Sequence, residues 1–228
     1  RDRGAHRLHS NRVGLVRVAN TGGDGRGWVS WPRPPFPMNA QILAIEQSTA
    51  PTADPVTLAE VKNFCRIDED RDDALLADLI TTAIRDIENR VGRQLITATW
   101  KLYLGDFPSD GPIRLPRPPL RSISTITYVD TNGTTQTEAA AVYAAAVDIK
   151  SEPGTVRPAY GQVWSSHRCG AQDRVIVTYS AGYGDTAASV PDDLRLAIML
   201  LVRAWYDQEP EPKAVASLVQ SRVSGWIW

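Results

Sequence analysis

The sequence predicts an α+β protein: a small helical bundle with an inserted β-rich region, an extended N-terminal arm and a C-terminal tail. Residues 75–91 and 194–205 repeat apolar side chains at steps of three and four, as helices do, whereas residues 97–180 contain stretches of strand-like alternation. Residues 1–37 are rich in Gly and Arg and show no sustained period. Because helical stretches lie on both sides of the alternating region, we expect the sheet to be an insert within one bundle.

We expect residues 1–54 to form the extended arm. Its first 37 residues contain seven Arg against Asp2 and Asp24, a net charge of +5, and end in the polyproline-like "WPRPPFP". The first Met is Met38, so this part is either a processed leader or upstream translation, or a basic arm that contacts nucleic acid or a neighbouring subunit. The remaining chain has 18 basic and 24 acidic residues, a net −6, which disfavours a module that grips phosphates over its whole surface.

Two helices are expected next. In "TLAEV" the Thr57 hydroxyl and the Glu60 carboxylate have the spacing of a capping box, which predicts a helix over 58–66. After the acidic "DEDRDD", a buried apolar face predicts a second helix over 72–91, with Gly92 as its stop.

The β insert is expected over 97–180. "TWKLYLGDF" alternates as a strand does, and Asn132-Gly133 supplies the residues that a tight hairpin needs. The prolines of "IRLPRPPL" cannot donate to a ladder, so this stretch is predicted to be an edge or a connecting arm.

A third long helix is predicted over 191–207, which completes a domain spanning 55–208. It is apolar almost all round, so it needs neighbours on several faces. "EPEP" then ends it, and residues 209–228 are expected to form a tether with a short amphipathic helix, 214–223, and the terminal "SGWIW".

The sequence contains little that indicates catalysis. His167 lies near Cys169, but a nucleophile also needs an oriented base and oxyanion donors, so a Cys/His hydrolase is only a remote alternative. The run from Asp68 starts like a calcium loop but has Asp73 where Gly is required and Leu79 where Glu is required. We therefore predict no enzyme activity, no cofactor and no metal site.

Neither membrane insertion nor export is indicated. No run of 18 apolar residues occurs, and the first residues do not have the pattern of a secretory signal. The two cysteines, Cys65 and Cys169, are expected to be free thiols, and assembly in the cytosol is the default expectation.

Several stretches in this order resemble one protein family. They are "PVTLAEVKNFCRIDEDRDDALLADLITTAIRDIENRVGRQLITATW", "IRLPRPPLRSISTITYVDTNG", "EPGTVRPAYGQVW", "VTYSAGYGD" and "VPDDLRLAIMLLVRAWYDQ". Together they look like the head-tail connector family, also called adaptor or head-completion proteins, of long-tailed phages, prophages and gene transfer agents. The resemblance covers about 55–223 and makes 55–208 a connector domain.

The resemblance implies a structural virion component, located at the head-tail interface of a phage or gene transfer agent particle and assembled in the bacterial cytoplasm. It implies a homo-oligomeric ring, usually of twelve copies, that joins the portal to the stopper and tail proteins and extends the DNA channel. The partners would be further copies of the chain, the portal and the stopper, with duplex DNA passing nearby and no membrane. The alternative is a DNA-contacting assembly factor that uses the basic arm.

The resemblance also implies where the partners bind. In the family the segment after the last long helix reaches the portal, and we expect the apolar terminus to dock in a portal groove. The expected portal-binding residues are Val215, Leu218, Val219, Arg222, Trp226, Ile227 and Trp228. Subunit or stopper contacts are expected at Tyr160, Trp164, Leu200 and Trp205, although Tyr160 and Trp164 could equally cover the chain's own sheet.

Overall fold

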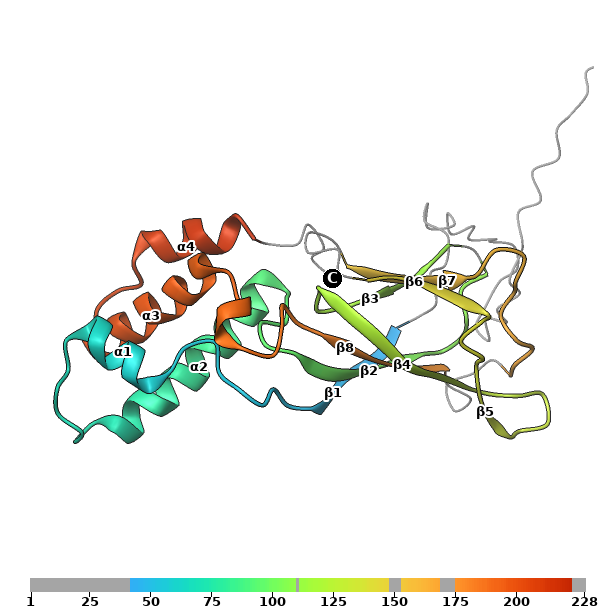
Figure 1. Cartoon of the computed structure of the whole chain (residues 1–228), viewed down its shortest axis with the longest axis horizontal. Helices are drawn as coiled ribbons and strands as arrows, with labels where there is room; N and C mark the ends of the chain where they lie inside the picture. Colours follow the sequence, from blue (N-terminus) through green and yellow to red (C-terminus); the bar gives the residue numbers. More distant parts are fainter. Residues whose placement is uncertain (1–41, 110, 148–152, 169–174, 223–228) are drawn as a thin grey trace, which may run out of the picture. The chain divides into compact units, whose positions relative to one another are not determined.

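The computed structural model describes residues 42–109, 111–147, 153–168 and 175–222, and it confirms the α+β class (Figure 1). The predictions for residues 1–41 and for "SGWIW" lie outside these ranges. Two hydrophobic cores are present in the described residues, one among the helices and one between two β-sheets.

Four α-helices enclose the first core. They are α1 Leu58–Cys65, α2 Asp73–Val91, α3 Asp192–Tyr206 and α4 Lys213–Gln220. The first three agree with the predicted ranges to within one residue at each end. The capping box is confirmed, because the Glu60 amide donates to Thr57 Oγ1 at 3.2 Å and the Thr57 amide donates to Glu60 Oε2 at 2.8 Å.

Two antiparallel sheets enclose the second core. The larger sheet has the order β1-β2-β8-β4-β5 and the smaller one β3-β7-β6. The strands are β1 Ile42–Thr49, β2 Ala98–Leu104, β3 Ile113–Leu115, β4 Leu120–Val129, β5 Thr135–Thr137, β6 Tyr143–Ala146, β7 Gly154–Pro158 and β8 Val175–Ala181. Buried side chains alternate along β2 and β8, as expected for strands with one face on a core.

The approach of the two sheets depends on a glycine. A Cβ atom at Gly154 in β7 would lie 2.3 Å from the Cβ of Leu120 in β4, which is far inside van der Waals contact. The sheets therefore pack closely at this point only because residue 154 has no side chain.

Two local predictions in the β region are confirmed. β4 and β5 form the hairpin, with Gly133 at φ +83° and its amide donating to the Asp130 carbonyl at 3.0 Å. The proline-rich stretch begins with β3, which is an edge strand of the smaller sheet.

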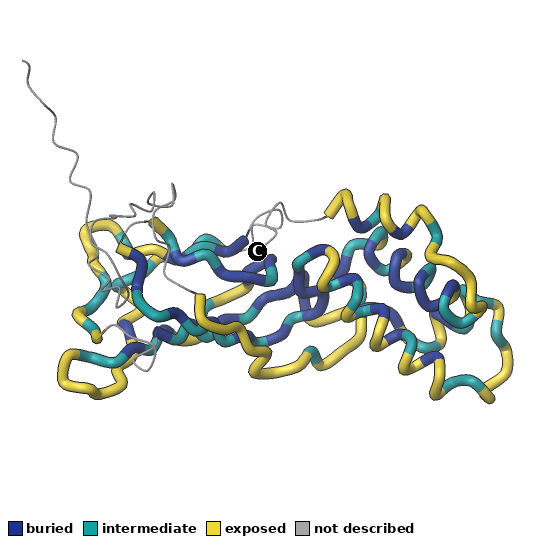
Figure 2. The backbone as a smooth tube through the Cα atoms, turned by 180° about the vertical axis from the view of Figure 1, so that it is seen from behind, coloured by how far each residue is buried: buried dark blue, intermediate teal, exposed yellow. Residues whose placement is uncertain are grey.

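The predicted arm over residues 1–54 needs a correction. Residues Ile42–Thr49 form β1, which pairs antiparallel with β2 at the edge of the larger sheet. The pairing arises because the second edge of β2 offers backbone groups that an extended segment can satisfy. All eight residues of β1 are nevertheless exposed (Figure 2).

Candidate interaction surfaces

The last described helix, α4, is docked on the helical core. The Val215 side chain is fully buried and Val219 is 6% exposed. Arg90 of α2 holds the segment that precedes α4, because its guanidinium donates to both carboxylate oxygens of Glu211, at 2.6 and 2.9 Å. This hydrogen bonding lowers the pKa of Glu211. Residues 209–222 are therefore not the free tether that we predicted.

The end of α4 is held as well. Arg93 Nε donates to the backbone carbonyl of Arg222 at 2.9 Å, and Arg222 Nε donates to Asp193 Oδ2 in the first turn of α3 at 2.7 Å. The end of α4 is thus held both by the segment that follows α2 and by the first turn of α3.

These contacts change the interpretation of the predicted portal-binding residues. The prediction that Val215 and Val219 bind the portal needs a correction, because their buried side chains hold α4 to the bundle and are not available to a partner. Leu218 is half-buried and packs against the same core, while Arg222 is exposed and paired within the chain. The predicted contacts of Trp226, Ile227 and Trp228 lie outside the described residues.

The predicted contact residues of α3 lie partly inside the bundle. Leu200 and Trp205 are half-buried and pack against the helical core. Leu196 on the same helix is 37% exposed, and the sequence analysis did not single it out. Only the outer parts of Leu200 and Trp205 are therefore open to a neighbour.

The loop 159–168, which follows β7, is braced against the sheets. The Trp164 ring stacks on Phe107 with centroids 4.5 Å apart and planes within 7°. Ser165 donates to Glu138 from its amide at 3.2 Å and from its hydroxyl at 2.8 Å. Trp164 therefore covers the chain's own sheet, which is the second of its two expected roles.

Tyr160 has the opposite environment. Its relative exposure is 105%, and that of Val163 is 79%. The Gln162 amide donates to the Ala159 carbonyl at 2.9 Å and Gly161 has φ +74°, so Tyr160 occupies the corner of a tight turn. A fully exposed aromatic side chain on a braced loop is a candidate contact residue.

His167 is engaged within the same loop. Its Nε2 is paired with Asp106, its Nδ1 lies 2.9 Å from the Ser165 carbonyl oxygen, and its ring meets Phe107 edge to face. Cys169, the nucleophile of the remote hydrolase alternative, lies outside the described residues. The observed contacts assign His167 a part in bracing the loop.

A cavity of about 230 Å³ lies between the end of β1 and α2, and we refer to it as the β1–α2 cavity. Its walls include Gln47 of β1, Pro51 and Pro55 of the next segment, Ile84 and Glu88 of α2, and Ile96. The sequence contains no local signal for this cavity, because the cavity is formed by segments that are distant in the sequence.

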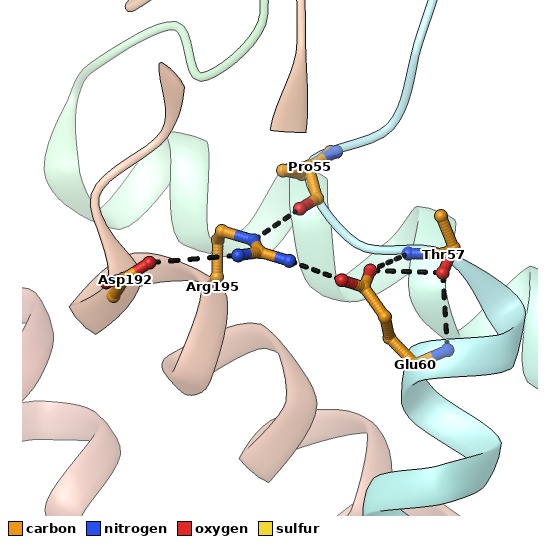
Figure 3. Close-up of polar contacts among 5 residues, drawn as sticks. All are labelled: Pro55, Thr57, Glu60, Asp192 and Arg195. Atoms are coloured by element: carbon orange, nitrogen blue, oxygen red, sulfur yellow. Dashed lines mark hydrogen bonds and ion pairs between the residues drawn. The ribbon is translucent and has the colours of Figure 1, made fainter. Parts of the chain in front are cut away.

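Arg195 of α3 contacts Pro55, which is one of the residues that line this cavity, and Figure 3 shows the polar contacts of Arg195. Its Nε donates to the Pro55 carbonyl at 2.9 Å and its Nη2 donates to Glu60 Oε1 at 2.5 Å. The hydrogen bond from the Thr57 amide and the charge of Arg195 both hold the pKa of Glu60 below its ordinary value. The same carboxylate thus caps α1 and anchors the cavity wall.

Glu88 is the acidic group in the inner part of the cavity wall. Its Oε1 accepts from Gln94 Nε2 at 2.7 Å and from the Leu95 amide at 3.0 Å. Burial raises the pKa of Glu88, against the opposing effects of the Leu95 hydrogen bond and of Arg117 and Arg85.

Neither the acidic run after α1 nor any other group of side chains in the described residues forms a metal site. The acidic run after α1 is tied to Lys62, whose Nζ lies 2.5 Å from Asp70 and 2.7 Å from Asp73. Across the described ranges, no three His, Cys, Asp or Glu side chains are grouped to hold a metal ion. No helix in them is long and apolar enough to cross a membrane.

Comparison with protein-family models gives a match to the head completion protein family over residues 55–217. The chain belongs to this family. The match covers most of the chain and confirms the resemblance on which the sequence analysis relied.

Solved structures similar to this head completion protein come from gene transfer agent (GTA) particles. Chains from the neck of an empty GTA particle computed with C6 symmetry and from the virion of a native GTA particle both align with a TM-score of 0.68. A chain from the neck of a native GTA particle computed with C12 symmetry aligns with 0.66. Each shares 22% sequence identity and covers 82% of this chain and 98% of its own, so the shared feature is the fold. No curated protein matches.

Proposed function

We propose that this head completion protein is a head-tail adaptor, a structural component without catalytic activity that joins the portal to the stopper and tail proteins. The observation that carries the proposal is the family match over residues 55–217. The fold shared with chains of GTA necks supports it, and the C12 symmetry of one of those necks favours a ring of twelve copies. The protein would be located in the particle, between head and tail, after assembly in the bacterial cytoplasm.

The charge of the chain favours a place beside the DNA channel. Residues 38–228 carry a net charge of −6, so their surface as a whole repels the phosphate backbone. An acidic ring would let DNA pass without holding it, whereas a strongly basic ring would slow it.

Attachment to the portal is assigned to Trp226, Ile227 and Trp228. Two indole side chains and an isoleucine provide a large apolar area that a groove can bury. Even a modest free energy per copy gives lasting attachment when it is repeated around a ring.

The test uses the phage or gene transfer agent that encodes the chain. Loss of the gene is expected to give DNA-filled heads and separate tails, visible by electron microscopy. A chain that lacks residues 224–228 should fold but join heads to tails with a yield at least tenfold lower. Normal joining by the truncated chain would contradict the portal anchor, and normal particles without the gene would contradict the adaptor function.

A further inference from the structure

The described surface has a projection and a hollow that could fit each other. The first is the turn at Tyr160, a projection, and the second is the β1–α2 cavity, a hollow. We propose that Tyr160 of one copy inserts into the β1–α2 cavity of a second copy of this chain. This contact rests on the proposed ring and supplies a specific interface for it.

Tyr160 is held ready for such a contact before binding. The turn that carries it is anchored on one side by the Ala159 amide, which donates to the Val142 carbonyl at 2.8 Å. On the other side the stacked Trp164 and the hydrogen bonds of Ser165 fix the loop to the sheets. Little backbone entropy therefore remains to be lost when Tyr160 is buried.

The cavity has the size for a phenol ring. A cavity of about 150 Å³ lined by apolar side chains accommodates benzene, and the β1–α2 cavity measures about 230 Å³. Pro51, Pro55, Ile84 and Ile96 offer carbon surface to the ring. The rest of the wall is more polar and includes Gln47, Asp54, Thr81, Arg85 and Glu88. Tyr160 of the same copy does not occupy it, because that side chain is fully exposed.

The polar groups of the cavity also suit tyrosine. Both hydrogen bonds to the Glu88 carboxylate go to Oε1, and no further bond to Oε2 is formed within the described residues. The Tyr160 hydroxyl can therefore donate a hydrogen bond to Glu88 Oε2 or to the side-chain carbonyl oxygen of Gln47. An aromatic guest without a hydroxyl would leave this carboxylate oxygen buried and without a donor.

The strand beside the cavity extends the apolar surface. Ile42 and Ile45 pair with Leu104 and Leu102, two residues on the inner face of β2, so a register shift in β1 puts both isoleucines on one face. They are 41% and 39% exposed. A guest turn that inserts Tyr160 would bring Val163 onto this apolar face.

The two halves of the contact are different surfaces, and this decides the type of assembly. Each copy has one projection and one hollow. When the projection of the first copy enters the hollow of the second, the hollow of the first copy and the projection of the second copy remain free. Such head-to-tail contacts form a ring when the rotation between copies closes, and an open filament when it does not. The proposed ring requires the first case. A two-fold dimer would instead require one surface to be complementary to itself.

The experiment uses five variants of the full chain and measures self-association by sedimentation velocity from micromolar to millimolar concentration. Tyr160→Ala removes the projection. Ala53 and Thr81 both line the cavity, so Ala53→Trp fills the hollow and Thr81→Trp is a second way to fill it. Each is expected to weaken association at least tenfold, as loss of a central aromatic anchor does. Tyr160→Phe should weaken it less. Leu75→Ala, at an exposed apolar residue of α2, is the matched control and should leave association unchanged.

Mixing the variants gives the decisive result. Tyr160→Ala keeps an open hollow and Ala53→Trp keeps the projection, so their mixture is expected to form one-to-one pairs and nothing larger. Association of either variant as strong as that of the original chain, or a mixture without pairs, would overturn the contact. So would an original chain that stays monomeric at millimolar concentration. The adaptor function would survive these outcomes, because head-tail joining tests it separately.

Discussion

Glu88 shows how one residue can join the helices to the sheets. Its carboxylate accepts from Gln94 and Leu95, which lead from α2 into β2, and its backbone carbonyl accepts from Arg117 Nη1 at 3.3 Å. Arg117 in turn lies over the Trp100 ring, with its guanidinium carbon 5.4 Å from the ring centroid. The junction is stabilised at the cost of desolvating a carboxylate.

The raised pKa of Glu88 predicts a specific pH dependence. The folded protein holds this proton more tightly than the unfolded chain, so the contribution of Glu88 to stability falls as pH rises above the ordinary Glu pKa, 4.5. Glu88→Gln keeps an oxygen acceptor for both hydrogen bonds and removes the titration. The free energy of unfolding of the variant minus that of the original chain should therefore increase as the pH is raised from 4 to 7. Urea unfolding of both proteins at each pH measures this difference.

The comparison isolates Glu88 from other carboxylates. Glu60, Asp70, Asp130 and Glu211 have lowered pKa values, so their contributions to stability are lost as pH falls. Both proteins lose this stability equally as pH falls, so the loss cancels when the unfolding free energy of the original chain is subtracted from that of Glu88→Gln. A difference that is constant over the pH range would contradict the assigned environment of Glu88.

At the scale of elements, α4 depends on two valines for its place on the bundle. Val215→Ala removes two methyl groups from a fully buried site and is expected to lower the free energy of unfolding by about 2 kcal/mol. The α4 amides should then exchange with deuterium faster than those of α2. Gln220→Ala, at an exposed position of the same helix, is the control and should change stability by less than about 0.5 kcal/mol. Unchanged exchange in α4 after Val215→Ala would show that the valines do not hold the helix.

The helices were predictable because their signals are local. Thr57 and Glu60 are three residues apart, and the apolar face of α2 repeats within one segment. The stripe of Val215 and Val219 was also recognised, but a stripe does not identify what covers it. The residues that pack against this stripe lie in α3 and in segments more than a hundred positions earlier in the sequence. Because the sequence does not show this packing, the stripe was interpreted as a surface for a partner.

β1 and the cavity were missed for the same physical reason. "ILAI" has no alternation, and its residues become a strand only because β2, which lies about 55 residues later, offers a free edge. The β1–α2 cavity needs β1, the turn before α1 and the outer face of α2 at once. The exposed Tyr160 was expected as a contact residue, whereas its turn and the bracing of its loop required the structure.

At the scale of the whole molecule, the division of charge yields a prediction about DNA. Residues 38–228, with a net charge of −6, are expected to show no measurable affinity for duplex DNA at 150 mM salt in a fluorescence anisotropy titration. The full chain adds seven Arg, so any affinity that it shows should be sensitive to salt and should be lost when residues 1–37 are deleted. Salt-sensitive binding by residues 38–228 alone would contradict the passive channel and favour a DNA-contacting factor.

The contacts at the end of α4 also limit where a partner can lie. Arg222 is held by Arg93 and Asp193, and Trp228 lies six residues after Arg222 in the sequence. Six residues span at most about 20 Å. If the terminus docks as proposed, the groove that receives it must come within that distance of Arg222. Attachment by this terminus would fix which end of the helical bundle faces the partner, before any other surface makes contact.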